Sequence, residues 1–121
     1  MTMGIGVLIE THNEEKNIAD CIRSARLLTR SVVVVDMQST DKTVEIAKAN
    51  GAQIREFGTH PLYVEPAREF GVKQVKTDWV LILDADERIT KESAEEIKKA
   101  IQSDQYTCYK IPRKNIASIL V

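Results

Sequence analysis

Hydrophobic residues gather in short runs that end abruptly in polar residues. Residues 5–10, 31–35 and 79–83 form such runs, and none is long enough for an amphipathic helix. They lack the polar alternation of a strand with one solvated face, and valine, which favours strands, dominates the second run. We therefore predict three strands that are buried on both faces of a parallel sheet.

The segments between these runs carry apolar residues at helical spacing. A first helix follows the cap-type segment 11–13 and has apolar positions at 18, 22, 25 and 28. A second follows the cap-type segment 39–41 and ends before Gly51, and a third covers residues 65 or 66 to about 75. A fourth begins after Thr90 and turns three apolar side chains inward: Ala94, Ile97 and Ile101.

Three weaker strand signals complete the pattern. Residues 53–57 form a short strand before a loop at 58–61, residues 106–111 alternate like a fifth strand, and the apolar residues 116–121 read as a last strand. Strands that alternate with helices predict an α/β fold. We expect a Rossmann-like three-layer α/β/α arrangement with a mostly parallel sheet and right-handed crossovers, built as one domain from residues 1–121.

Composition limits the partners of the chain. Its 17 basic and 18 acidic residues give a net charge of -1, and no basic run is interleaved with aromatic residues, so we expect no nucleic-acid partner. No apolar stretch approaches the roughly 20 residues of a membrane span, and we find no secretion signal, which predicts a cytoplasmic protein. Cys21 and Cys108 form no C-x-x-C pair, which favours two buried thiols in a reducing compartment.

Several common chemistries lack their sequence signatures. The Gly4-Ile5-Gly6 segment precedes the first strand, whereas a dinucleotide fingerprint lies between a strand and a helix. No Walker A sequence, G-x-S-x-G elbow or H-E-x-x-H motif occurs, and the chain has only two histidines. These observations argue against dinucleotide-binding, P-loop, serine-hydrolase and zinc-hydrolase functions.

An acidic segment at the end of the run 79–83 is the strongest chemical signal. Asp84, Asp86 and Glu87 follow that run directly, and ligands of open α/β sheets bind beyond the carboxyl ends of the strands. Clustered carboxylates repel one another unless a cation offsets them, and divalent cations prefer oxygen ligands. The alternative is that the acids solvate the strand end and favour the start of the next helix. This segment alone does not decide between the two interpretations.

Four segments together resemble the motifs of family-2 glycosyltransferases. They are Ile-Glu-Thr-His-Asn-Glu-Glu at 9–15, Val-Val-Val-Asp-Met-Gln-Ser-Thr-Asp-Lys-Thr at 33–43, Ala-Arg-Glu-Phe-Gly at 67–71, and Leu-Asp-Ala-Asp at 83–86. The last is similar to the D-x-D motif of that family. The motifs stand in the family's order over about the first ninety residues. The resemblance implies a GT-A fold and a nucleotide-diphosphate sugar donor.

The resemblance also implies roles for individual residues. His12 stands where the family usually has a tyrosine that stacks on the base, and Asp36 would accept hydrogen bonds from the base or ribose. Arg68 would pair with the diphosphate, and Asp84 would meet the ribose or a metal-bound water. Asp86 would hold Mg²⁺ or Mn²⁺. The residues implied to bind the donor nucleotide are Thr11, His12, Asn13, Glu14, Asp36, Arg68 and Asp84.

Some positions depart from the family pattern. Met37 and Gln38 replace an Asp and a Gly, and Glu69 replaces an Asn, which leaves the base and the shape of its pocket open. Nothing after Glu87 matches the family's catalytic base, so no catalytic residue is assigned. The resemblance therefore implies a donor-binding part without the acceptor-binding part, either truncated or naturally short.

The leading hypothesis is a metal-dependent inverting transfer of sugar to an acceptor hydroxyl on a glycan or lipid carrier. Such a protein can lie at the inner face of the membrane, and an exposed strand edge can drive formation of a homodimer. One alternative is a non-catalytic nucleotide-sugar-binding or scaffold subunit. A second is a receiver-like phosphoacceptor module, which also has a doubly wound sheet with an acid at a strand end.

Overall fold

The computed structural model describes residues 4–58, 70–102, 108–110 and 118–120. Strands and helices alternate along the first part of the chain, as the sequence predicts, and residues 70–74 are also helical. The elements in chain order are β1 (Ile5–Thr11), α1 (Ile18–Ala25), β2 (Val32–Asp36), α2 (Thr43–Ala49), β3 (Gln53–Glu56), β4 (Trp79–Asp84), α4 (Lys91–Ile101), β5 (Cys108–Lys110) and β6 (Ser118–Leu120).

The strands form one sheet in the order β3-β2-β1-β4-β6-β5. β3, β2, β1 and β4 run parallel, which confirms the mostly parallel sheet. The predicted fifth strand is seen as β5, which pairs antiparallel with β6. β6 in turn pairs antiparallel with β4, so the last apolar segment lies between the two strands that precede it in the chain.

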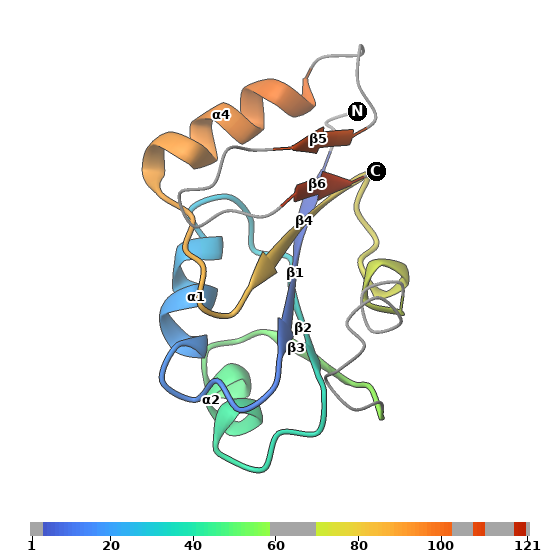
Figure 1. The fold of residues 1–121 in the computed structure, drawn as a ribbon. Coiled ribbons are helices and arrows are strands. Elements are labelled where there is room, and N and C mark those ends of the chain that lie inside the picture. The colour runs from blue at the N-terminus through green and yellow to red at the C-terminus, as the bar shows by residue number, and fades with distance from the viewer. Residues whose placement is uncertain (1–3, 59–69, 103–107, 111–117, 121) are drawn as a thin grey trace.

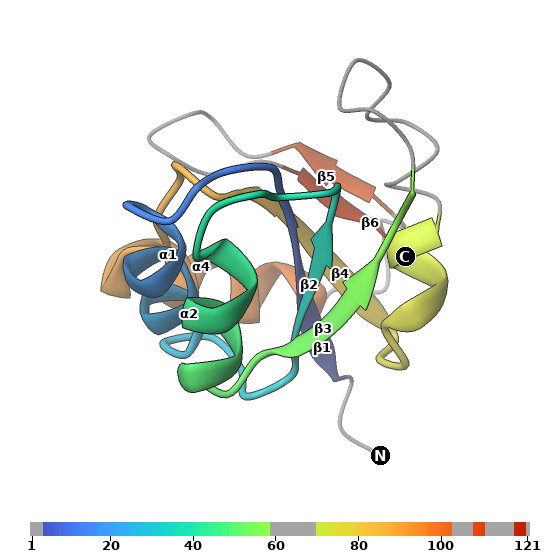
Figure 2. The same ribbon diagram turned by 90° about the horizontal axis from the view of Figure 1, so that it is seen from below.

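Helices cover both faces of the sheet, which confirms the predicted three layers (Figure 1). α1, α2 and α4 lie on one face and the helix at 70–74 lies on the other (Figure 2). Successive residues of a strand point to opposite faces. Val7, Ile9 and Leu81 therefore pack into the core under α1, α2 and α4, whereas Leu8 and Ile82 pack into the second core. This two-sided burial explains why the strands read as continuous apolar runs.

The helix at 70–74 approaches the sheet closely at Gly71. A Cβ atom at this position would lie 2.6 Å from Cδ1 of Leu8 and 3.0 Å from Cγ2 of Val35. The ring of Phe70 packs beside that of Phe57 at a centroid distance of 5.3 Å. Because Gly71 has no side chain, this helix can pack directly against the sheet and cover the second core. The predicted helix start at 65 or 66 lies outside the described residues.

The predicted helix ends are partly confirmed. Thr90 caps α4 and shares a reciprocal capping box with Ser93, and Gly51 has the positive φ of 81° expected after a helix. The predicted caps at 11–13 are wrong, because Thr11 belongs to β1 and α1 begins only after Asn17. Tertiary contacts hold residues 12–16 in a loop instead. Among the described helices, none is long and apolar enough to cross a membrane.

Candidate functional site

Three loops meet where the parallel strands end. We call residues 12–17, after β1, the first loop; residues 37–42, after β2, the second loop; and residues 84–88, around the end of β4, the acidic loop. Thr11 pairs in register with Asp36, and Glu10 pairs with Asp84. The strand ends are therefore level, and the loops that carry the family-like motifs lie side by side, as the topology rule for such sheets predicts.

Asn13 joins the first loop to the second. Its backbone N–H donates to Oγ of Ser39 at 2.8 Å, and its side-chain Oδ1 accepts from the backbone N–H of Thr40 at 2.7 Å and of Asp41 at 3.4 Å. Asn13 adopts a φ of 52°, a left-handed conformation that asparagine tolerates better than most residues. In this structure the amide oxygen of Asn13 thus organises the second loop.

Glu14 and Glu15 add reciprocal links between the same loops. The N–H of Glu14 donates to Oγ1 of Thr43 at 2.8 Å, and the N–H of Lys42 donates to the Glu15 carboxylate at 3.2 Å. Asp41 accepts from the N–H groups of Glu15 and Thr43 and from the Thr43 hydroxyl. Desolvation raises the pKa of Asp41, but the hydrogen bonds from Thr43 outweigh it and hold the pKa below its ordinary value of 3.8.

Asp36 lies buried between the first two strand ends and is only 2% exposed. Its Oδ1 accepts from the Thr11 hydroxyl at 2.9 Å and from the Ser39 hydroxyl at 2.6 Å, and its Oδ2 accepts from the Ser39 N–H at 3.0 Å. The carboxylate therefore fixes the turn after β2. A donor nucleotide would find Oδ2 with capacity for one more hydrogen bond.

His12 is held in one orientation by the second loop. Its Nδ1 lies at hydrogen-bond distance from the carbonyl oxygen of Met37, which can only accept, so Nδ1 carries the proton of this bond. In the neutral ring Nε2 then has a lone pair, and the Asn13 side-chain amide lies 3.4 Å from it. The imidazole is half-buried. The ring is thus pre-oriented at the site where the sequence predicts base stacking.

The three acids of the acidic loop have different surroundings. Asp86 is exposed and Asp84 is half-buried, but Glu87 is buried and its Oε1 accepts the backbone N–H of Asp84 at 2.9 Å. The Glu87 N–H donates to the Asp84 carbonyl oxygen, also at 2.9 Å. Glu87 thus shapes the loop, whereas Asp84 is half-buried and Asp86 is exposed at the loop surface.

This donor set fits Mg²⁺ or Mn²⁺ that is shared with a phosphate ligand. No cluster of three or more His, Cys, Asp or Glu side chains suited to a metal occurs among the described residues. Mg²⁺, however, is usually held by one or two carboxylates together with the phosphates of its substrate. Asp86 would supply one hard oxygen ligand of that kind, and Asp84 lies close enough in the chain to meet a metal-bound water.

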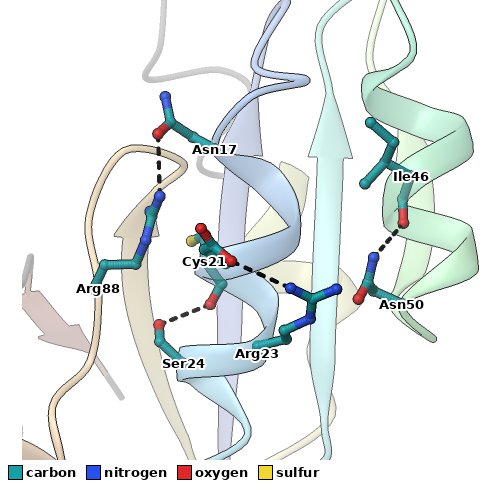
Figure 3. Close-up of polar contacts among 8 residues, drawn as sticks. Asn17, Cys21, Arg23, Ser24, Ile46, Asn50 and Arg88 are labelled. Atoms are coloured by element: carbon teal, nitrogen blue, oxygen red, sulfur yellow. Dashed lines mark hydrogen bonds and ion pairs between the residues drawn. The ribbon is translucent and has the colours of Figure 1, made fainter.

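A second set of contacts, not expected from the sequence, ties the acidic loop to α1 (Figure 3). Arg88 Nη1 donates to the carbonyl oxygens of Ala85 and Glu87, each at 2.8 Å, and Nη2 donates to Oδ1 of Asn17 at 3.1 Å. The Cys21 thiol lies 3.5 Å from the Asp84 carbonyl oxygen, and burial raises its pKa to about 12. Cys21 is therefore buried, as the sequence predicts.

Arg68, the predicted diphosphate ligand, lies outside the described residues. Lys42 and Lys73 are exposed.

Comparison with known proteins decides the family. The family model described as "Glycosyl transferase family 2" matches residues 6–119. The chain belongs to glycosyl transferase family 2. This confirms the resemblance that the four motifs indicate, and it leaves a receiver-like module without support.

Relatives of this family 2 chain are longer than the chain itself. An uncharacterised glycosyltransferase of Rickettsia typhi is 38% identical over 116 residues, which cover 88% of this chain and 37% of that protein. The glycosyltransferase SunS of Bacillus subtilis is 27% identical over 99 residues, 81% of this chain and 23% of SunS. The chain thus spans between about a quarter and two fifths of the curated relatives that it matches.

Solved structures confirm the GT-A fold of the chain. S. aureus TarS superposes with a TM-score of 0.79 at 21% identity, over 98% of this chain and 47% of that one. Glucosyl-3-phosphoglycerate synthase from Mycobacterium tuberculosis in complex with Mg²⁺ and UDP superposes with a TM-score of 0.59 at 26% identity, over 69% of this chain and 34% of that one. TarS has also been solved with UDP-GlcNAc.

Proposed function

We propose that this family 2 chain binds a nucleotide-diphosphate sugar at the carboxyl ends of β1, β2 and β4, as the donor-binding part of an inverting glycosyltransferase. The observation that carries the proposal is the pair Asp84 and Asp86, one half-buried and one exposed, at the end of the central strand β4 and level with the first loop. The Mg²⁺ and UDP bound to the M. tuberculosis synthase support a uridine nucleotide with a divalent cation.

The first two loops would hold the nucleoside. The His12 ring, oriented by the Met37 carbonyl oxygen, would stack on the base, and Asp36 Oδ2 would accept one hydrogen bond from the base or ribose. Thr11, Asn13 and Glu14 would act mainly by holding these groups in place. Asn13 connects the first loop to the second, Thr11 bonds to Asp36, and Glu14 bonds to Thr43 at the start of α2.

The acidic loop would hold the diphosphate end of the donor. Asp86 would bind Mg²⁺ or Mn²⁺, and Asp84 would meet the ribose or a metal-bound water. When bound, the cation offsets the negative charge that develops on the departing nucleoside diphosphate. Arg68 would pair with the diphosphate through its planar guanidinium.

Transfer itself needs an acceptor and a general base, for which the described residues offer no assignment. Acceptors of the proposed reaction are hydroxyl groups of a glycan or a lipid carrier. A cytoplasmic location, at the inner face of the membrane for a lipid acceptor, and a homodimer remain predictions. A non-catalytic nucleotide-sugar-binding subunit is the second candidate, because the chain covers the donor-binding motifs and only part of its relatives' length.

Calorimetric titration of the chain with UDP and with GDP tests the proposal. We expect UDP binding that requires Mn²⁺ and disappears with excess chelator, and at least a tenfold loss of affinity in Asp86→Asn. Asp78→Asn is the matched control, because Asp78 is an exposed aspartate just before the same strand. UDP binding that is unchanged by chelator and by Asp86→Asn would refute the metal assignment.

A further inference from the structure

A side-chain contact between Arg88 and Asn17 links the acidic loop to the first loop. These residues are 71 positions apart in the chain, and Arg88 Nη2 donates to Asn17 Oδ1 at 3.1 Å. Arg88 is half-buried, and its Nη1 donates to two carbonyl oxygens of its own loop. The guanidinium therefore binds the acidic loop through one nitrogen and Asn17, the N-cap residue of α1, through the other. Figure 3 shows the contact with Asn17.

Asn17 is in turn hydrogen-bonded to Glu14, which contacts the start of α2 just after the second loop. Its Nδ2 donates to Oε1 of Glu14 at 3.4 Å, and the Glu14 backbone N–H donates to Oγ1 of Thr43 at 2.8 Å. A continuous hydrogen-bond path thus runs from the start of α2, through Glu14, Asn17 and Arg88, to the carbonyl groups beside Asp86.

Two further hydrogen bonds tie the backbone just after the acidic loop to α1. The Ile89 N–H donates to Oγ of Ser24 at 3.0 Å, and that hydroxyl donates to the Cys21 carbonyl oxygen at 2.8 Å. Ser24 therefore anchors the residue that follows the acidic loop to the last turn of α1. The Arg88 contact, by contrast, acts on residues of the acidic loop itself.

We propose that Arg88 is a positioning residue that couples the nucleoside-binding first loop to the acidic loop, so that metal binding and nucleotide binding reinforce each other. The proposal rests on the proposed function for its ligands, but the mechanical link between the loops does not. Arginine suits this role because its planar fork can serve several carbonyl oxygens at once, whereas a lysine ammonium cannot reproduce that geometry.

Binding measurements test the coupling. We define metal enhancement as the ratio of the UDP dissociation constant in chelator to that in Mn²⁺. We expect Arg88→Met and Asn17→Ala each to lower it about tenfold, because both remove the hydrogen bond of the charged guanidinium that links the two loops. The double variant should lose little more than either single variant, and Arg88→Lys should recover only part of the enhancement.

Matched controls separate coupling from general loss of stability. Arg23 is an exposed α1 arginine that pairs with Asp20 at 3.3 Å, and Asn50 is the C-cap residue of α2, with Nδ2 donating to the Ile46 carbonyl oxygen at 2.9 Å (Figure 3). Arg23→Met and Asn50→Ala should leave metal enhancement unchanged. If Arg88→Met lowers the melting temperature but keeps the wild-type enhancement, Arg88 is merely structural and the proposal is wrong.

Hydrogen exchange decides the same question without a ligand. The N–H groups of Asp84 and Glu87 are both hydrogen-bonded within the acidic loop, and we expect Asn17→Ala to speed their exchange at least threefold although it touches neither. Asn50→Ala should not. Unchanged exchange in Asn17→Ala would overturn the link between the loops. A wild-type chain that binds no UDP would instead refute the proposed function, and the exchange result would still decide the coupling.

Discussion

Asn13 provides the sharpest test of how the site is built. If its amide oxygen organises the second loop, Asn13→Ala must cost folding stability as well as nucleotide affinity. The substitution removes the acceptor of the Thr40 N–H at 2.7 Å and of the Asp41 N–H at 3.4 Å, and it places alanine at a φ of 52°.

The size of the effect follows from two contributions. Losing the shorter hydrogen bond costs about 1 kcal/mol, because the site is exposed and water replaces part of the interaction. Alanine has a Cβ atom but no polar side chain that could compensate, so its left-handed conformation costs roughly 1–2 kcal/mol more. We therefore expect Asn13→Ala to lower the free energy of unfolding by about 2–3 kcal/mol.

Two further substitutions separate these contributions. Asn13→Gly tolerates the positive φ but lacks the acceptor, so it should cost about 1–2 kcal/mol, including its greater unfolded-state entropy. Asn13→Asp keeps both the acceptor and the tolerance of this conformation, and should cost less than either. Gln38→Ala is the control, because Gln38 has a φ of 57° and its exposed side chain holds no hydrogen bond among the described residues.

Urea denaturation measures these changes. Trp79, the single tryptophan, is 4% exposed and reports unfolding by fluorescence. With a slope of about 2 kcal/mol per molar urea, Asn13→Ala should lower the midpoint by roughly 1 M. A midpoint within about 0.2 M of wild type, or Asn13→Asp as destabilised as Asn13→Ala, would refute the organising role. Asn13 would then be only a ligand contact.

Three other predictions follow from described contacts. Gly71→Ala should destabilise the chain by about 1–3 kcal/mol in the same assay, because the new methyl group would lie 2.6 Å from a leucine carbon of β1, whereas Gly58→Ala, with no atom within 4 Å, should be neutral. In a variant whose other cysteine is replaced by alanine, Cys21 should resist a thiol reagent at pH 8 and react within minutes in denaturant, since burial raises its pKa to about 12; rapid native labelling would contradict this burial. The pKa of Asp41 is held low chiefly by Thr43, against the opposing effect of desolvation, so its carboxylate stabilises the fold above the ordinary pKa of 3.8 and this contribution is lost as pH falls below it. The stability difference between wild type and Asp41→Asn should therefore shrink under acid and stay constant at neutral pH, and a difference that grows under acid would contradict this sign.

Local patterns predicted the strands, helices and family with few errors. The runs at 5–10, 31–35 and 79–83 indicated buried parallel strands because side chains on both faces of β1, β2 and β4 are covered. The helix cap at Thr90 was predictable because the bonded groups lie three residues apart. The caps at 11–13 were not, because these residues bond across to the second loop rather than to their own helix.

The same distinction between local patterns and tertiary contacts applies to the candidate site. The sequence alone determined which residues could do the chemistry, since carboxylates after an apolar strand and the four family motifs are local features. Only the tertiary structure decided how they act: Asp36 and Asn13 are engaged in holding the turns, Glu87 shapes the acidic loop, and Arg88 reaches Asn17 over 71 positions. The physical reason is that hydrophobic periodicity records which face of an element is buried, whereas the partner of a polar side chain depends on which strand ends the folded sheet brings level.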